Sequence, residues 1–137
     1  MKPWTAIALA AGVGLGGTSE SLAQALGKTE YQAARKTIES DFRSAKTGCE
    51  PMHGNVRIVC IADVRGRESI ALAELRAAYD PTSDSMVDVR IAKARAALEL
   101  SRARCDDLPV QRKPACTADA GAAHGAALAP PKAVPSK

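Results

Sequence analysis

Apolar residues recur at intervals of three and four over four segments of the chain, which is the spacing of amphipathic helices. In the first segment, residues 29–48 and the cysteine that follows, they form a stripe made up of Tyr31, Ala34, Ile38, Phe42, Ala45 and Cys49. In the second segment, residues 56–79, the stripe consists of Val56, Val59, Cys60, Val64, Ala71, Leu72, Leu75 and Tyr79. The pattern predicts two helices separated by a turn. Gly66 lies inside the second helix and is expected to cost about 1 kcal/mol relative to alanine.

A third helix is predicted over residues 86–105, after a turn at residues 80–85 that is rich in residues which bend the chain and cap helices. Its apolar stripe consists of Val87, Ile91, Ala94, Leu98, Ser101 and Cys105. Ser83 or Asp84 is expected to cap this helix, because both side chains accept hydrogen bonds from backbone N–H groups.

The fourth predicted helix, residues 115–128, is the weakest of the four. It follows a break at residues 106–114 and consists mostly of alanine and glycine, with no large side chain before Leu128. The last segment, residues 129–137, contains three prolines and no apolar stripe. We therefore expect the chain to end in a disordered tail.

Residues 1–25 have the three parts of a cleavable signal peptide, which are a basic start, an apolar stretch and small residues before the cut. These parts are Lys2, Thr5–Gly17 and Ala23-Gln24-Ala25. Cleavage is expected to leave Leu26 as the mature N-terminus. The alternative of a membrane anchor is disfavoured, because the apolar stretch is shorter than the roughly 20 residues that span a bilayer. The sequence thus predicts export to the periplasm or beyond, with no transmembrane segment after cleavage.

The composition of the remaining chain favours an all-α protein. Alanine, the best helix former, is abundant, and only Tyr31, Phe42 and Tyr79 are aromatic once Trp4 has left with the signal peptide. The length suits one domain, residues 26–128. The net charge of +4 is spread among interspersed acids and bases, so it gives no indication of nucleic-acid binding.

Four cysteines occur as two pairs with the same spacing. Cys49 and Cys60 are 11 residues apart, as are Cys105 and Cys116, and the two pairs are offset by 56 residues. The same offset aligns other residues, including Ala71-Leu72-Ala73 with Ala127-Leu128-Ala129. We interpret this as a degenerate duplication in which residues 29–79 and 86–128 are two copies of one unit.

The spacing also bears on which cysteines are bonded. Eleven residues of unbroken helix would separate two Cα atoms by about 16 Å, which no disulfide spans. In that case the bonds would be Cys49–Cys116 and Cys60–Cys105, between antiparallel partners. Breakers in both intervals, namely Pro51, Gly54, Pro109 and Pro114, favour Cys49–Cys60 and Cys105–Cys116 instead. Because four cysteines allow three pairings, the alternative stays open.

Several short motifs surround the paired cysteines, namely Tyr31, Ala45-Lys46-Thr47 before Cys49, Gly54-Asn55, Val59-Cys60, Ala71-Leu72-Ala73-Glu74-Leu75 and Cys105-Asp106-Asp107-Leu108. In these motifs the chain resembles a group of small betaproteobacterial exported proteins, loosely labelled cell-envelope or TolA-like, which have Ala/Lys/Glu-rich helices and paired cysteines around a Gly-Asn turn. The second turn departs from the pattern, because Val110-Gln111 stands where Gly-Asn is expected, and lysines are fewer. The resemblance implies a helical fold and an envelope location, and it implies no activity.

Candidate chemistry is sparse. Met52 and His53 lie between two cysteines, so this turn is a weak candidate for copper or zinc if the thiols were reduced. The only histidines, His53 and His124, stand far apart in sequence, and the carboxylates Asp63, Glu68 and Glu74 alternate with Arg65, Arg67 and Arg76 like a solvated helix face. We therefore expect no enzyme, no catalytic residue, no metal and no cofactor.

The sequence as a whole predicts two disulfide-stapled helical hairpins, arranged as an antiparallel coiled coil or a bundle, with disulfides formed by Cys49, Cys60, Cys105 and Cys116. The expected function is that of an exported, non-catalytic structural or interaction protein of the cell envelope. Its partner would be an envelope protein or a second copy, bound through a helix face. The alternative is a periplasmic metal-binding or stress-responsive protein that uses the turn between Cys49 and Cys60.

Overall fold

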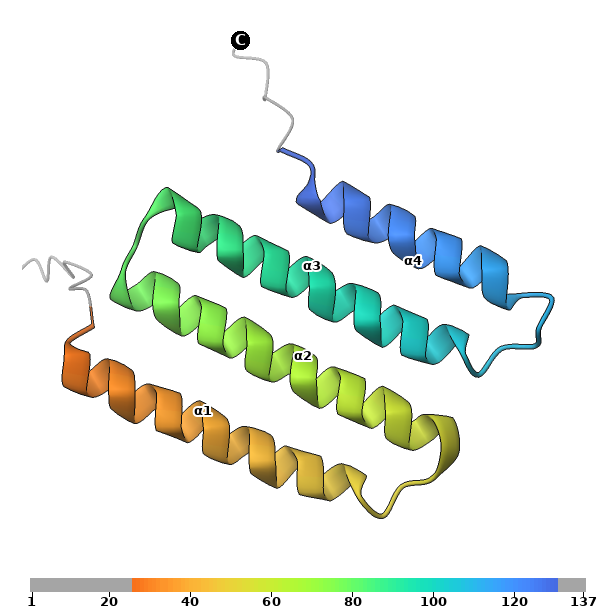
Figure 1. Cartoon of the computed structure of the whole chain (residues 1–137), viewed down its shortest axis with the longest axis horizontal. Helices are drawn as coiled ribbons and strands as arrows, with labels where there is room; N and C mark the ends of the chain where they lie inside the picture. Colours follow the sequence, from red (N-terminus) through yellow and green to blue (C-terminus); the bar gives the residue numbers. More distant parts are fainter. Residues whose placement is uncertain (1–25, 131–137) are drawn as a thin grey trace, which may run out of the picture.

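The computed structural model describes residues 26–130, which form four helices and no strand. The helices are α1 (Lys28–Cys49), α2 (Gly54–Tyr79), α3 (Ser83–Cys105) and α4 (Lys113–Leu128) (Figure 1). The all-α prediction is thereby confirmed. The predicted signal peptide and most of the predicted tail, residues 131–137, lie outside the described residues.

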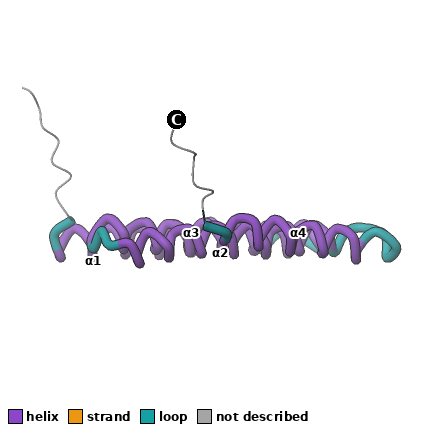
Figure 2. The backbone as a smooth tube through the Cα atoms, turned by 90° about the horizontal axis from the view of Figure 1, so that it is seen from above, coloured by secondary structure: helices purple, strands orange, loops and turns teal. Residues whose placement is uncertain are grey.

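The four helices lie side by side in a single layer. Each helix packs on its neighbour in the chain, so that α2 contacts α1 and α3, and α3 contacts α2 and α4; within residues 26–130 no other two helices pack together. Seen from the edge, the layer is one helix thick (Figure 2). The two predicted helical hairpins, α1–α2 and α3–α4, are present, but they do not close around a shared four-helix core.

Each helix begins one to three residues earlier than the apolar pattern predicts. The start of α3 shows why. Thr82 is its cap: Oγ1 of Thr82 accepts a hydrogen bond from the N–H of Ser85 at 3.1 Å, and Oγ of Ser85 accepts one from the N–H of Thr82 at 3.0 Å. The expectation that Ser83 or Asp84 caps this helix is wrong, because the extended backbone and the reciprocal partner belong to Thr82.

The turn between α1 and α2 depends on Gly54. This residue has a φ of +58°, in the left-handed region that side chains with a Cβ rarely adopt. The positive φ turns the chain sharply enough for only four residues to separate the end of α1 from the start of α2. The short turn brings Cys60, in the second turn of α2, back to the end of α1.

Two disulfides close the necks of the two hairpins. Cys49 is bonded to Cys60 and Cys105 to Cys116, with Cα–Cα distances of 5.8 and 5.7 Å. The favoured pairing is confirmed, and the crossed alternative is wrong because each pair of cysteines flanks a turn. Cys49 and Cys105 are the most deeply buried side chains among the described residues, with 0% and 1% of their surface exposed. At the other end of the first hairpin, the rings of Tyr31 and Tyr79 lie 4.6 Å apart.

The interface between α2 and α3 is built from small residues. Gly66 is buried there, and a Cβ added to it would lie 2.9 Å from the Cβ of Ala96. Of the buried residues of α3, Ala92 and Ala103 line hollows between α2 and α3. Gly66 is therefore more than the weak point that helix propensity predicts, since its missing side chain allows the two central helices to approach closely.

Removing the two disulfides should have unequal effects. We expect Cys49→Ser/Cys60→Ser to lower the free energy of unfolding by about 2 to 3 kcal/mol while α1 stays helical, because its aromatic and aliphatic side chains still pack on α2. We expect Cys105→Ser/Cys116→Ser to release α4, whose only buried residue is Ala120, and to reduce the helical circular dichroism signal by roughly a fifth. Equal helicity in the two variants would contradict this.

Gly66→Ala should destabilise the protein by about 1 kcal/mol, even though alanine is the better helix former, because its methyl group meets Ala96. In an Ala96→Gly background the same change should instead stabilise by a similar amount. Gly121→Ala is the matched control: it lies in α4 with no atom within 4 Å of an added Cβ, so it should stabilise. Urea unfolding of the four variants measures these effects, and stabilisation by Gly66→Ala alone would refute the close packing.

Candidate interaction surface

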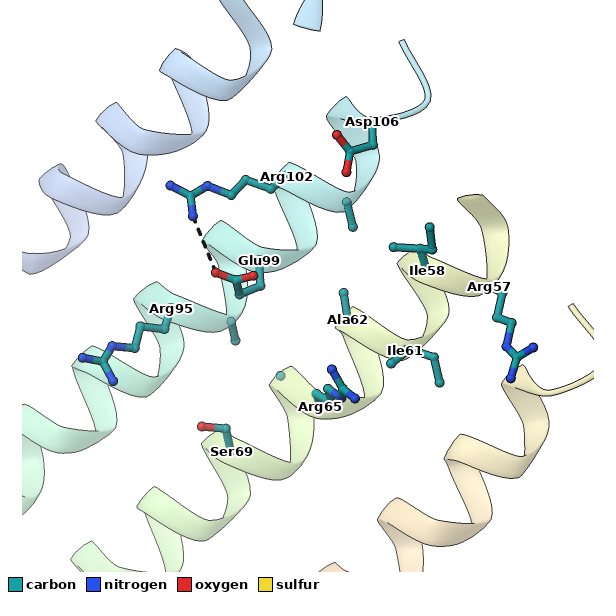
Figure 3. Close-up of a pocket in the computed structure, with 13 residues that line it drawn as sticks. Arg57, Ile58, Ile61, Ala62, Arg65, Ser69, Arg95, Glu99, Arg102 and Asp106 are labelled. Atoms are coloured by element: carbon teal, nitrogen blue, oxygen red, sulfur yellow. Dashed lines mark ion pairs between the residues drawn. The ribbon is translucent and has the colours of Figure 1, made fainter. Parts of the chain in front are cut away.

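An open groove runs between α2 and α3 on one face of the layer. It encloses about 600 Å³. Its lining comes from α2 and α3 and ends at Asp106, just past the end of α3 (Figure 3). The thirteen residues that line it are Arg57, Ile58, Ile61, Ala62, Arg65, Gly66, Ser69, Arg95, Ala96, Glu99, Arg102, Ala103 and Asp106. We call this feature the α2–α3 groove.

The floor of the α2–α3 groove is apolar and lies below charged walls. Ala62, Gly66 and Ala96 form its base, since the same three residues also line a hollow on the opposite face of the two helices. On the α2 side Ile58 stands 54% exposed, and on the α3 side the side chains of Arg95 and Arg102 extend away from α2 (Figure 3). The groove thus exposes an apolar strip between polar edges.

The charge of the α2–α3 groove is mainly positive. Four arginines line it against two carboxylates. Arg102 lies 3.8 Å from Glu99, and both side chains are at least half exposed. Among residues 26–130, Arg57, Arg65 and Arg95 have no carboxylate within ion-pair distance. Their guanidinium groups are free to bind an external anionic group.

A second hollow of about 330 Å³ continues the groove along the same face. It shares Ser69 and Arg95 with the first and adds Arg76, Leu72 and Ile91. The combined strip extends along most of α2, from Arg57 near its start to Arg76 near its end.

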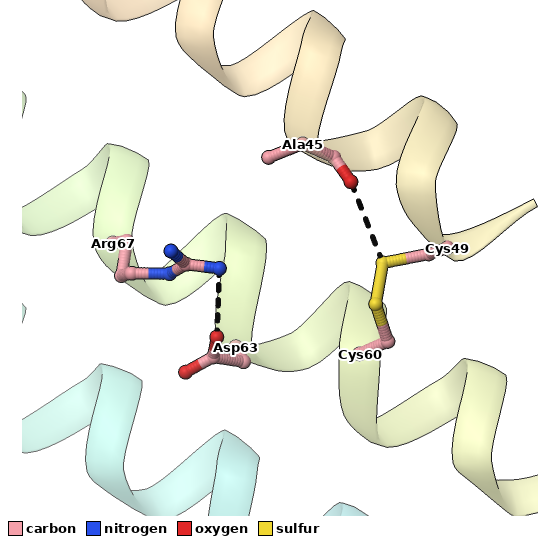
Figure 4. Close-up of polar contacts among 5 residues, drawn as sticks. All are labelled: Ala45, Cys49, Cys60, Asp63 and Arg67. Atoms are coloured by element: carbon pink, nitrogen blue, oxygen red, sulfur yellow. Dashed lines mark hydrogen bonds and ion pairs between the residues drawn. A yellow bond between two sulfur atoms is a disulfide. The ribbon is translucent and has the colours of Figure 1, made fainter.

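The opposite face of the same two helices has a different charge arrangement. A smaller hollow of about 230 Å³ lies there, and its charged residues are Asp63, Arg67 and Lys93. Nη2 of Arg67 is 2.9 Å from Oδ2 of Asp63 (Figure 4), and Nζ of Lys93 is 2.7 Å from Oε1 of Glu74. On this face the basic groups are already paired within the protein, so the two faces of the layer are electrostatically distinct.

The turn that was considered as a metal site is occupied by a disulfide. Both Cys49 and Cys60 are in the bond, and Sγ of Cys49 lies 3.7 Å from the carbonyl oxygen of Ala45 (Figure 4). Met52 is half-buried and His53, the residue before α2, is exposed. Within residues 26–130 no cluster of three or more His, Cys, Asp or Glu side chains could hold a metal ion. His124 belongs to α4, which does not contact α2.

Sequence reasoning missed the α2–α3 groove, although part of its signal was visible. Arg65 and Arg76 were interpreted as a solvated face together with Arg67, yet the structure places Arg67 on the other side of the layer. Arg95 and Arg102 are seven residues apart and therefore share one face of α3. Which arginines of α2 lie beside them depends on how the two helices pair.

Comparison with models of known protein families, with curated proteins and with solved structures finds no match to this chain. The resemblance to small exported envelope proteins therefore stays a prediction. Of the helices in residues 26–130, none combines the length and apolar character needed to cross a bilayer.

Copper(II) or zinc(II) added to the oxidised protein should change its melting temperature by less than about 1 °C, because both thiols are consumed in the disulfide and a ligand that does not bind cannot stabilise. Thermal melts at increasing metal concentration, with His53→Ala as the control, measure this. A metal-dependent rise that His53→Ala abolishes would reinstate the turn as a metal site.

Proposed function

We propose that this protein is an exported, non-catalytic interaction protein of the cell envelope, and that it binds its partner through the face of the layer that carries the α2–α3 groove. The observation that carries the proposal is the combination of an open apolar strip with arginines that have no partner within the described residues. Exposed apolar surface bordered by polar groups is typical of protein interaction sites.

The disulfides support the assignment to an exported protein. Disulfides form and persist in oxidising compartments such as the periplasm, and they are rare in the cytosol. Both bonds here lie within the chain and close the turns of its two hairpins. Together with the predicted signal peptide at residues 1–25, they favour the periplasm.

The distribution of reactive side chains supports a non-catalytic role. An activated nucleophile needs a base within hydrogen-bond reach, and histidine is the usual base. His53 precedes α2 at the neck of the first hairpin, whereas His124 is on α4 in the second. Neither lines the α2–α3 groove or its continuation. The groove offers arginines and small apolar residues, which suit binding.

A photo-crosslinking experiment in cells of the source organism tests the proposal. The full chain would carry p-benzoylphenylalanine at Ser69, in the groove, or at Ser40, an exposed residue of α1 that serves as the control. We expect a discrete crosslinked species from Ser69 and none from Ser40, in the periplasmic fraction. Mass spectrometry of the same material should show a chain that begins at Leu26 and contains both disulfides.

Two results would contradict the proposal. One is a chain that stays in the cytosol with reduced thiols, and the other is the absence of any specific adduct from Ser69. An adduct with the mass of two copies of this chain would identify the partner as a second copy.

A further inference from the structure

The shape and charge of the α2–α3 groove indicate what kind of partner it accepts. We propose that it binds an acidic amphipathic helix of a partner protein, which lies along the groove and forms a third helix against α2 and α3. This inference rests on the proposed function, and it adds the chemical class of the partner.

The dimensions of the groove fit a helix. Two adjacent helices leave a furrow between them, and a third helix packs into such a furrow at 8–10 Å from each axis when the side chains at the contact are small. Here the floor consists of Ala62, Gly66 and Ala96. The strip from Arg57 to Arg76 corresponds to about 28 Å of helix at 1.5 Å per residue, which is the length of a partner helix of roughly five turns.

The arginines flank this floor on both sides. Arg65 stands on the α2 side, and Arg95 and Arg102 stand on the α3 side (Figure 3). A helix that directs an apolar stripe at the floor would carry carboxylates on both edges of that stripe, where each meets a guanidinium group. Complementary charge of this kind guides association and selects among partners.

The carboxylates in the lining of the groove favour one kind of partner. A helix with individually placed charges fits them better than a uniformly anionic surface does. Glu99 and Asp106 lie on the α3 side of the groove, and Asp88 lies on its continuation. They would repel the phosphates of a lipid surface. A basic residue at one edge of a partner helix can pair with each of them.

A second copy of this chain is a poorer occupant. In a symmetric dimer the same patch of both copies meets itself. That arrangement would bring two sets of four groove arginines together against only two carboxylates from each copy. The charge excess favours an acidic partner.

The test uses a designed helical peptide of about 20 residues, roughly the length of the groove, with leucine and alanine on one stripe, glutamate on both edges of the stripe and glutamine elsewhere. A second peptide carries lysine in place of every glutamate. Binding to the oxidised mature protein is measured by fluorescence anisotropy at low and at physiological salt.

The structure provides a matched pair of double variants. Arg65→Glu/Arg95→Glu reverses two groove charges, and Arg67→Glu/Lys93→Glu reverses two charges on the opposite face, each two residues away along the same helix. The two variants have the same net charge. Circular dichroism verifies that both double variants fold. If Arg65→Glu/Arg95→Glu does not fold, Arg65→Gln/Arg95→Gln replaces it.

We expect the glutamate peptide to bind and the lysine peptide not to bind. The groove variant should bind the glutamate peptide at least about tenfold more weakly, while the opposite-face variant changes affinity by less than about threefold, and higher salt should weaken binding. Equal losses in the two variants, binding of the lysine peptide, or no binding of the glutamate peptide would overturn the inference.

Two parallel measurements separate the alternatives. If the protein binds phosphatidylglycerol vesicles through Arg65 and Arg95 but does not bind the peptide, the inference is wrong and the partner is a lipid surface. If light scattering shows self-association that the groove variant abolishes, the inference is wrong and the partner is a second copy of this chain. If Ser69 still forms a specific adduct in cells while the peptide fails to bind, the inference is wrong and the proposed function stands.

Discussion

Each hairpin of this protein is held at its neck by a covalent bond, and the rest of the structure depends on these two bonds. Four helices in a single layer cannot enclose a common core, because every helix has at most two neighbours. The buried side chains are accordingly few and mostly small, with Val64 and Leu75 the largest aliphatic ones. A disulfide in such a fold limits the unfolded chain and keeps two helices together where apolar burial contributes little. The buried Cys49 and Cys105 therefore act as both cross-link and core.

The two hairpins are joined to each other without a covalent cross-link, through the contact of α2 with α3. Gly66 and Ala96 allow close approach there, and the hydrogen bonds between Thr82 and Ser85 begin α3 directly after the turn. Close approach of two backbones has a second effect, since small side chains leave furrows on both faces of the contact. The interface that unites the hairpins thus also creates the α2–α3 groove and the smaller hollow on the opposite face.

The charges on the two faces differ although both come from the same two helices. Asp63–Arg67 and Glu74–Lys93 satisfy the basic groups on one face, whereas Arg65 and Arg95 on the other have no carboxylate partner within the described residues. Exposed ion pairs of this type contribute little to stability. Their importance lies in electrostatics, because they pair Arg67 and Lys93 within the protein, whereas the groove arginines Arg65 and Arg95 are left unpaired among the described residues. A thin layer with one cationic furrow is suited to recognition by surface contact.

Much of this fold follows from local sequence. Helix periodicity, alanine content, the turn residues at 80–85 and the breakers at Pro51, Gly54, Pro109 and Pro114 determine four helices and three turns. Turns inside each C-x10-C interval bring the bonded cysteines together. The cap at Thr82 was missed because Ser83 and Asp84 are equally good caps by residue type, and only the backbone conformation distinguishes them. The single layer and the groove were decided by tertiary structure alone. Whether amphipathic hairpins close into a bundle or lie flat depends on which residues of α2 face α3. The same pairing places Arg65 and Arg95 on one face of the layer, and it places Arg67 on the opposite face.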